Sequence, residues 1–241
     1  MTDYSSVIKD IFKENKLDSL ISESSTGKLT KLIDRMIAVN EKMNLTAITA
    51  PEEIILKHIA DSATVIEFIP KKARLLDIGT GAGFPALPIA ILRPDVSVYA
   101  LDSTAKKLKY IDETASILEL DNVKTVSGRA EELGRTVNYR ERFDVVTARA
   151  VASLNVLTEL CMPFVKLGGQ FISMKGSGAA EELQSAKSGI IQLGGTCFDD
   201  REFNLRYNDS EFQRHILISK KTKNTPESFP RMYNRITKKP L

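Results

Sequence analysis

The sequence predicts an α/β fold in which a mostly parallel, seven-stranded sheet follows an N-terminal helical extension. Two observations predict this fold: seven short apolar runs follow residue 73, and amphipathic segments separate the first five of them. Strands that alternate with helices form βαβ units, whose strands are parallel. A glycine-rich segment directly after the first run places a ligand site at that end of the sheet.

We expect residues 1–70 to form a helical cap in front of the main domain. In residues 28–43 apolar side chains recur every three or four positions, which is typical of an amphipathic helix. A second broad apolar face predicts a helix over 51–69, and Pro51 suits its first turn.

Residues 71–220 are expected to hold the sheet. The segments 104–119 and 153–165 carry apolar residues in helical step, and the glycine pairs 168–169 and 194–195 are predicted to end helices. Only a short turn-like segment separates the last two strands, so we expect them to pair antiparallel as a hairpin. The predicted strands are residues 74–78, 97–102, 122–128, 143–150, 168–176, 196–205 and 214–220.

The composition fits a globular protein, because 42% hydrophobic residues are enough for a sizeable core. No apolar run reaches membrane-spanning length and the N-terminus has no apolar signal region, so we expect a cytoplasmic protein without a membrane partner. A monomer is the default expectation. Cys161 and Cys197 form no CxxC motif and the chain has only 2 histidines, so we predict buried thiols and no metal site.

The C-terminal residues form a basic tail, which we assign to 221–241. Residues 220–241 hold seven Lys and Arg against Glu227 alone, a net charge of +6, whereas residues 1–219 carry −3. A basic segment with Phe229 and Tyr233 suits contact with RNA phosphates and bases. A solvated, frayed terminus is the alternative.

The sharpest local signal is a glycine loop after the first strand, with Asp77 followed by Gly79, Gly81, Gly83 and Phe84. Glycines allow a tight turn from strand to helix and a close approach of backbone to ligand. The dinucleotide fingerprint G-x-G-x-x-G would need a glycine where Phe84 stands. The acid at Asp77 disfavours a pyrophosphate and suits a cationic ligand. S-adenosylmethionine has an ammonium and a sulfonium group and no phosphate, so we predict it as the cofactor.

Asp102 ends the second strand, 25 residues after Asp77. This spacing is close to that of a ribose-binding acid, whose oxygens accept both ribose hydroxyls, although an Asp here also suits a helix N-cap. Residues 128–131 end the third strand on the same edge, where they can read an adenine. Lys106 and Lys107 follow Asp102 and are either phosphate contacts or solvated side chains.

Three side chains are candidate catalytic groups. Arg149 follows the fourth strand. There it can bind the cofactor carboxylate or an RNA phosphate; the alternative is a structural ion pair. His58 shares one helical face with Asp61 and Ser62, and this cluster either contacts substrate or fixes the cap helix to the sheet. Lys175, at the end of the fifth strand, is a further candidate for phosphate contact.

These motifs resemble class I S-adenosylmethionine-dependent methyltransferases, which have a Rossmann-like α/β fold. More narrowly, the chain resembles the ribosomal small subunit methyltransferase G family of bacterial 16S rRNA guanine-N7 methyltransferases. The matching pieces are N-E-K-M-N-L-T (40–46), K-H-x-x-D-S (57–62), D-I-G-T-G-A-G-F-P (77–85), L-D-S (101–103), G-R-A-E (128–131) and T-A-R-A (147–150).

The resemblance implies cofactor contacts at Gly79, Phe84, Ala130, Glu131 and Arg149. Together with the loop and strand-end residues, the predicted cofactor site is Asp77, Gly79, Gly81, Gly83, Phe84, Asp102, Ala130, Glu131 and Arg149. The resemblance also implies the substrate, a guanine in 16S rRNA that becomes 7-methylguanosine, and the partner, 16S rRNA or the 30S subunit. It does not require the basic tail.

Methylation at guanine N7 needs no general base, because this nitrogen carries an exposed lone pair when the base is neutral. We therefore expect catalysis by orientation of two bound partners. Two other functions stay open: a methyltransferase of a small molecule or protein on the same fold, and a cofactor-binding ribosome-assembly factor without turnover. A nicotinamide-dependent oxidoreductase is disfavoured by Phe84.

Overall fold

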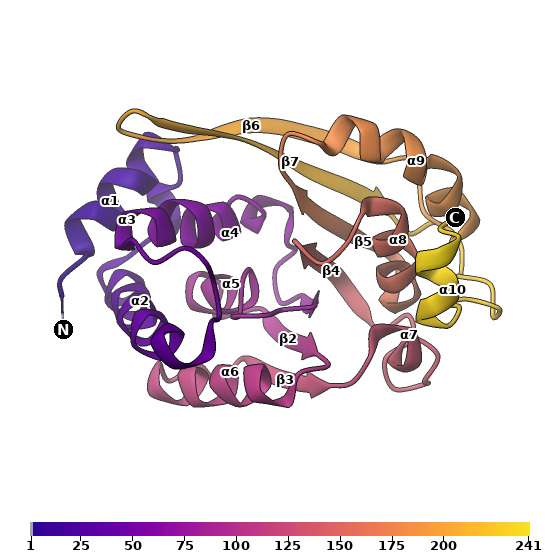
Figure 1. Ribbon diagram of the computed structural model, residues 1–241, viewed down its shortest axis with the longest axis horizontal. Helices are drawn as coiled ribbons and strands as arrows, with labels where there is room; N and C mark the ends of the chain where they lie inside the picture. The colour runs from indigo at the N-terminus through magenta and orange to yellow at the C-terminus, as the bar shows by residue number, and fades with distance from the viewer. Residues whose placement is uncertain (1) are drawn as a thin grey trace.

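Seven strands form one sheet in the order β3-β2-β1-β4-β5-β7-β6 (Figure 1). A computed structural model describes residues 2–241. Strands β1 to β5 are parallel, and β7 pairs antiparallel with both β5 and β6, so the predicted sheet and its closing hairpin are confirmed. The strands are β1 (Arg74–Ile78), β2 (Ser97–Asp102), β3 (Val123–Ser127), β4 (Phe143–Arg149), β5 (Val165–Lys175), β6 (Asp199–Tyr207) and β7 (Ser210–Lys220).

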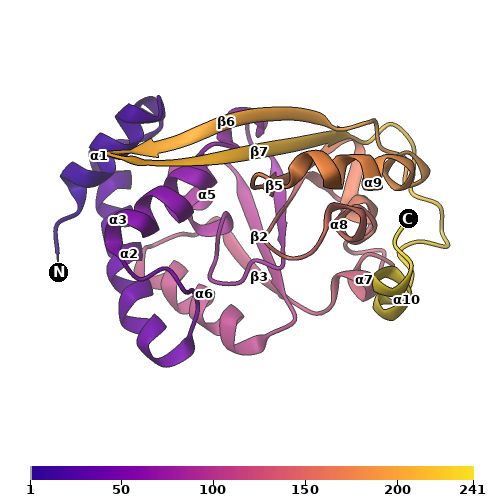
Figure 2. The same cartoon turned by 45° about the horizontal axis from the view of Figure 1, so that its top comes forward.

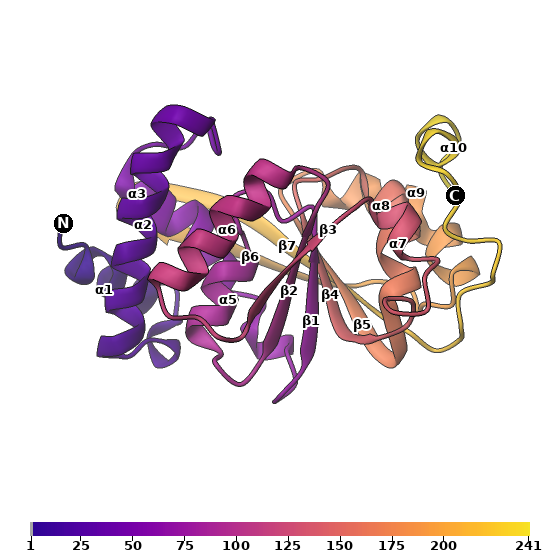
Figure 3. The same ribbon diagram turned by 90° about the horizontal axis from the view of Figure 1, so that it is seen from below.

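Helices cover both faces of the sheet (Figure 3). Successive strand residues point to opposite faces, so Leu75 and Val145 belong to one hydrophobic cluster while Leu76 and Val146 belong to the other. Burial on both faces explains why these strands read as continuous apolar runs. On one side lie α5 (Ala86–Leu92) and α6 (Ala105–Ile117), and on the other α7 (Ala130–Leu133), α8 (Leu154–Cys161) and α9 (Ala179–Gln192).

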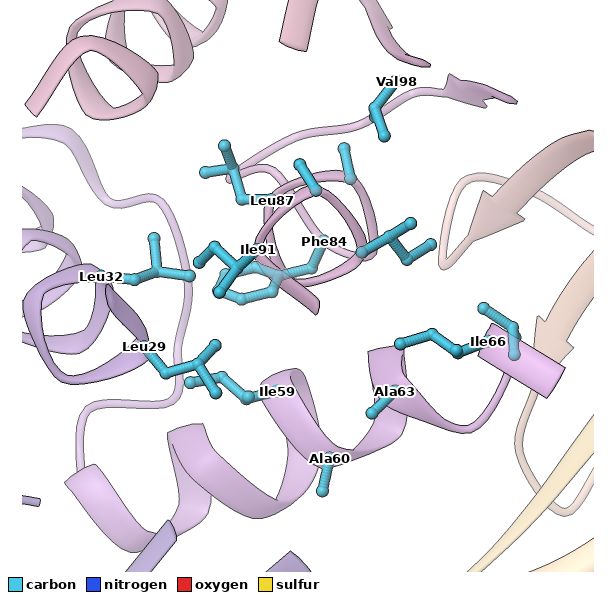
Figure 4. Packing of buried hydrophobic residues seen from close by; sticks show 14 of the residues in the cluster. Leu29, Leu32, Ile59, Ala60, Ala63, Ile66, Phe84, Leu87, Ile91 and Val98 are labelled. Carbon is cyan, nitrogen blue, oxygen red and sulfur yellow. The ribbon is translucent and has the colours of Figure 1, made fainter. Parts of the chain in front are cut away.

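The N-terminal helices pack outside α5 and add to the first cluster (Figure 4). They are α1 (Ser5–Glu14), a 3-10 turn (Asp18–Leu20), α2 (Glu23–Met43) and α3 (Pro51–Ile54). Leu29 and Leu32 of α2 face Leu87 and Ile91 of α5. The helical character predicted for residues 28–43 is confirmed, and the N-terminal helices share a continuous core with the sheet.

The helix predicted over 51–69 is interrupted. After α3 the chain winds as a π-helix over Ile55–Ala60, returns to one α-helical turn at Asp61–Ala63 (α4), and ends in a 3-10 turn at Ile66–Phe68. A π-helical turn is rare and is often found at functional sites. Here it carries His58.

Two predicted details of the C-terminal half are wrong. The helix over 153–165 stops at Cys161 and continues only as a 3-10 turn, because Pro163 cannot extend an α-helix. Gly168 ends no helix: with a φ of 78° it lies inside β5, where that strand bulges against β4. Gly194 does follow α9 with a φ of 88°, as predicted.

The β6–β7 hairpin is long and extends along the top of the molecule to α1 (Figure 2). The side chain of Asn15, after α1, donates to the Arg206 carbonyl (2.7 Å) and accepts from its amide (2.8 Å). His215 of β7 is buried, and its Nδ1 lies 2.9 Å from Asp200 Oδ1. The hairpin thus joins the N-terminal helices to the sheet.

Residues 221–241 fold back across α8 rather than extend into solvent. Lys221 is buried and donates to the Met162 carbonyl (2.7 Å), and burial lowers the pKa of its ammonium to about 8. Arg231 forms an ion pair with Glu159 of α8, whose side chain is fully buried. The last helix, α10 (Tyr233–Lys238), inserts Ile236 into the second hydrophobic cluster. The alternative of a frayed terminus is wrong.

Cys161 is buried as predicted, but Cys197 is exposed. Cys197 lies in the connection between α9 and the edge strand β6. Within residues 2–241 no helix is both long and apolar enough to cross a bilayer. The same residues contain no cluster of three or more His, Cys, Asp or Glu side chains arranged to bind a metal ion.

The Glu159–Arg231 pair predicts a stability change. Arg231→Ala leaves a buried carboxylate with only the residue 231 amide as donor, so we expect the free energy of unfolding to fall by about 3 kcal/mol, the lower end for breaking a buried pair. Urea denaturation measures this change. Arg235→Ala, on the exposed side of α10, is the control. Equal stability of the two variants would contradict the role of the pair.

Candidate functional site

The strand order reverses between β1 and β4, and open α/β sheets bind ligands at the carboxyl ends of such strands. Two cavities open there. The first, the strand-2 cavity, has a volume of about 360 Å³ and is lined by residues that include Asp102, Arg129, Ala130, Glu131 and Tyr233. The second, the strand-4 cavity, has about 220 Å³ and is lined by residues that include Thr46, His58, Gly81, Phe84 and Arg149. Both cavities include Gly79, Lys107 and Ala150.

The glycine loop needs its glycines for conformation and for space. Gly79 has a φ of 68°, and a Cβ on it would lie 2.6 Å from Cγ2 of Val151. Gly83 has a φ of 88°, and its Cβ would meet Leu87 at 2.5 Å. Gly79 and Gly81 line the cavities, whereas Gly83 shapes the turn into α5. A side chain at either constrained position would distort the loop.

Asp77 lies behind the loop and lines neither cavity. Its Oδ1 accepts from the Thr147 hydroxyl (2.9 Å), which ties β1 to β4. Within the described residues its Oδ2 is buried without a hydrogen-bond partner. Because the carboxyl group is buried, its pKa is raised to about 6. The side chain therefore acts on the site through its charge and through the β1–β4 contact.

Asp102 is held in a fixed orientation at the strand-2 cavity. Oδ2 accepts from the Gly81 amide (3.1 Å) and Oδ1 from the Thr104 amide (2.8 Å). The first bond couples β2 to the glycine loop. Each carboxylate oxygen keeps a second acceptor site, so the side chain can accept two hydroxyl donors from a ligand.

Ala130 and Glu131 begin α7 at the far side of the same cavity. Glu131 is buried, and its Oε1 lies 3.5 Å from Nε of the half-exposed Arg129. The structure thus brings Asp102, Ala130 and Glu131 together around one cavity, as the sequence predicted for a nucleoside site.

Arg149 lines the strand-4 cavity and is also ion-paired. Its Nη1 donates to Asp61 Oδ2 (3.0 Å) and to the Lys57 carbonyl (2.9 Å) of the π-helical turn. Asp61 is buried and also accepts two bonds of 2.8 Å from Arg214 of β7. The structural ion pair is therefore present, and it fixes the guanidinium at the wall of the cavity.

His58 is oriented by three neighbours. Arg149 Nη2 lies 3.2 Å from Nδ1, and because a guanidinium only donates, Nδ1 accepts and Nε2 carries the proton. Nε2 then donates to the Thr46 hydroxyl (3.0 Å). The ring stacks on Phe84 with centroids 4.8 Å apart. Burial and the charge of Arg149 lower the pKa of His58 to about 4, so the ring is uncharged at neutral pH.

Lys175 lies away from both cavities. Its Nζ donates to Glu182 Oε2 (2.7 Å) and to the Ala152 carbonyl (2.8 Å). The side chain is mostly buried and connects the end of β5 to α9. This position supports a structural role in place of the predicted phosphate contact.

Some cavity residues, Thr46 and Val151 among them, were not identified as site residues from the sequence, and Tyr233 was expected only as an RNA contact of the basic tail. Thr46 lies in the loop after α2, Val151 follows Arg149, and Tyr233 comes from the C-terminal segment. Thr46 is the last residue of the motif N-E-K-M-N-L-T (40–46), and this motif could have identified it as a site residue. Val151 carries no local pattern, and the composition of the tail did not indicate that the fold brings Tyr233 to the strand-2 cavity.

The sheet order, the glycine loop and the acid that ends β2 define a class I S-adenosylmethionine-dependent methyltransferase fold. The chain resembles the S-adenosylmethionine-dependent O-methyltransferase of Thermotoga maritima with a TM-score of 0.51 at 14% identity, covering 79% of this chain and 72% of that one. It also resembles TYW2 of M. jannaschii, solved in complex with AdoMet, with a TM-score of 0.51 at 16% identity, covering 68% of this chain and 76% of that one.

Comparisons of the sequence identify a narrower group of proteins than the fold does. A family model described as rRNA small subunit methyltransferase G matches residues 25–198. Ribosomal RNA small subunit methyltransferase G of Acetivibrio thermocellus is 44% identical and covers 95% of this chain and 98% of its own length. The protein of the same name from Clostridium novyi is 45% identical, and the match covers 97% of this chain and 96% of that protein. The chain therefore belongs to the rRNA small subunit methyltransferase G family.

The raised pKa of Asp77 predicts a pH-dependent stability difference. The protonated carboxyl stabilises the fold below the unfolded pKa, and this contribution is lost as the pH rises through about 6. Asp77→Asn keeps an oxygen for Thr147 and does not ionise. At pH 4, close to the unfolded pKa of 3.8, part of this contribution is already lost, so between pH 4 and pH 7 we expect the variant to gain about 2 kcal/mol relative to the wild type in the absence of ligand. Urea denaturation at both pH values measures the difference, and a constant difference would contradict the shift.

Proposed function

We propose that this chain transfers a methyl group from S-adenosylmethionine to N7 of a guanine in 16S rRNA. One observation carries the proposal. In a chain of this family, a cavity suited to a nucleoside adjoins a second cavity at the strand reversal, and the two share Gly79, Lys107 and Ala150. One cavity holds the cofactor and the other receives the target base.

The residues of the strand-2 cavity fit S-adenosylmethionine. Asp102 offers two oriented acceptors for ribose hydroxyls, and Ala130 and Glu131 lie where the adenine would be bound. Gly79 leaves no room for a side chain between the loop and Val151, so the backbone itself faces the ligand. The buried, unpartnered oxygen of Asp77 favours a cationic ligand nearby.

When bound, S-adenosylmethionine supplies an electrophilic methyl group. The neutral guanine N7 needs no base, so the chain contributes orientation. His58 is fixed between Phe84, Thr46 and Arg149 and presents a planar, uncharged ring to the strand-4 cavity. Asp61 is shared between Arg149 and Arg214 and offsets only part of their charge, so the uncharged ring of His58 is the part of this wall that least opposes a base that becomes cationic. We assign His58 and Arg149 to substrate and cofactor positioning, and Lys175 to structure.

Contacts with the RNA backbone come from basic residues around the cavities. Lys107 lies at the junction of both cavities, and Arg129 is half exposed beside them. Of the seven cations in 220–241, Lys221 and Arg231 are used inside the protein, and the others are exposed. Phosphate contacts of this kind position an RNA without reading its sequence.

We propose further that the protein acts in the cytoplasm as a monomer on the 30S subunit. We assign residues 71–220 to the methyltransferase domain. The helical cap, residues 1–70, contributes His58 and Thr46 to the strand-4 cavity. From residues 221–241, Tyr233 lines the strand-2 cavity.

Transfer of labelled methyl from S-adenosylmethionine tests the proposed function. The purified protein is incubated with 30S subunits, with naked 16S rRNA and with a metabolite extract, and labelled products are analysed by nucleoside mass spectrometry. We expect label in 7-methylguanosine of the RNA. Label in the extract alone would indicate a non-RNA substrate, and no label despite cofactor binding would indicate an assembly factor.

The role of Asp102 predicts a loss of cofactor affinity. Asp102→Ala removes two charge-assisted acceptors, so we expect S-adenosylmethionine to bind about 100-fold more weakly, measured by calorimetry. Asp121→Ala, an exposed Asp at the opposite end of the sheet, is the matched control. If Asp102→Ala bound the cofactor as the control does, the ribose assignment would be refuted.

A further inference from the structure

The C-terminal segment is anchored on both sides of Tyr233. Before it, Arg140 donates to the carbonyls of Thr225 (2.7 Å) and Phe229 (2.8 Å). Two residues before Tyr233, Arg231 is paired with buried Glu159. After it, Ile236 is fully buried against α8. These contacts define the position of the Tyr233 side chain relative to the sheet.

Tyr233 lines the strand-2 cavity together with Asp102, Ala130 and Glu131. Its ring lies under the Arg129 guanidinium, whose Cζ is 5.5 Å from the ring centroid. This cation–π contact orients the ring, while 40% of the residue stays accessible. An aromatic ring is therefore available in the cavity that is also lined by the first residues of α7.

We propose that Tyr233 binds the adenine base of S-adenosylmethionine by stacking, so that the C-terminal segment forms part of the cofactor site. The inference rests on the proposed function. In the proposed site Asp102 binds the ribose, and the adenine lies beside the start of α7. An aromatic ring in the same cavity would therefore contact a purine, and purines stack well on Tyr and Arg planes. An RNA base is the weaker alternative, because Tyr233 shares its cavity with the ribose-binding acid.

Calorimetry with two probes tests the inference in the full-length protein. S-adenosylmethionine and 5′-methylthioadenosine share the adenosine, but the second lacks the amino acid. We expect Tyr233→Ala to weaken both by about tenfold, since loss of one base-stacking contact has an effect of this size. Tyr233→Phe keeps the ring and is expected to bind both within about twofold of the wild type. Met232→Ala, an exposed neighbour outside the cavity, is the matched control.

The outcomes separate this inference from the proposed function. Weaker binding of both probes by Tyr233→Ala, with rescue by Phe and an unchanged melting temperature, supports the stacking role. Unchanged probe affinity, with or without loss of 16S rRNA binding, overturns it and leaves the proposed function in place. If the wild type binds neither probe, both the inference and the proposed cofactor are overturned.

Discussion

A single buried carboxylate connects three distant parts of this molecule. Asp61, from the N-terminal helices, accepts bonds from Arg149 of β4 and from Arg214 of β7. Removing one charge from such a buried cluster leaves the others uncompensated, which is costly in a protein interior. The cluster therefore fixes the cap and the hairpin to the sheet at the place where Arg149 and His58 line the strand-4 cavity. The N-terminal extension thus contributes Thr46 and His58 to the lining of the strand-4 cavity.

The two cavities follow from the sheet order. Since β1 has β2 on one side and β4 on the other, the loop after β1 faces both the acid of β2 and the arginine of β4. Gly81 binds Asp102, and Gly79 lies at the boundary of both cavities. A ligand that reaches from one cavity to the other must pass this glycine, where a side chain would fill the space.

Local patterns predicted much of this molecule. The alternation of strands and helices, the glycine loop and the position of Asp102 depend on residues close in sequence, and all three agree with the structure. The bulge at Gly168 and the exposed thiol of Cys197 depend on which strand lies beside which, and local sequence does not contain that information. Lys175 occupies a predicted strand end, but its partner Glu182 comes from the next helix and removes it from the site.

The order in which the chain is synthesised adds a consequence for folding on the ribosome. A nascent chain that has reached residue 200 already contains the glycine loop, Asp102 and the buried acid Asp61. It lacks β7, which lies between β5 and β6, and so lacks Arg214 and the segment that carries Tyr233. Domains fold as units during synthesis, and pairings across long sequence separations form late. A chain of that length therefore lacks Arg214, which pairs with Asp61 beside the strand-4 cavity, and Tyr233, which lines the strand-2 cavity, so both cavities reach their final form only after the C-terminal strands have joined the sheet.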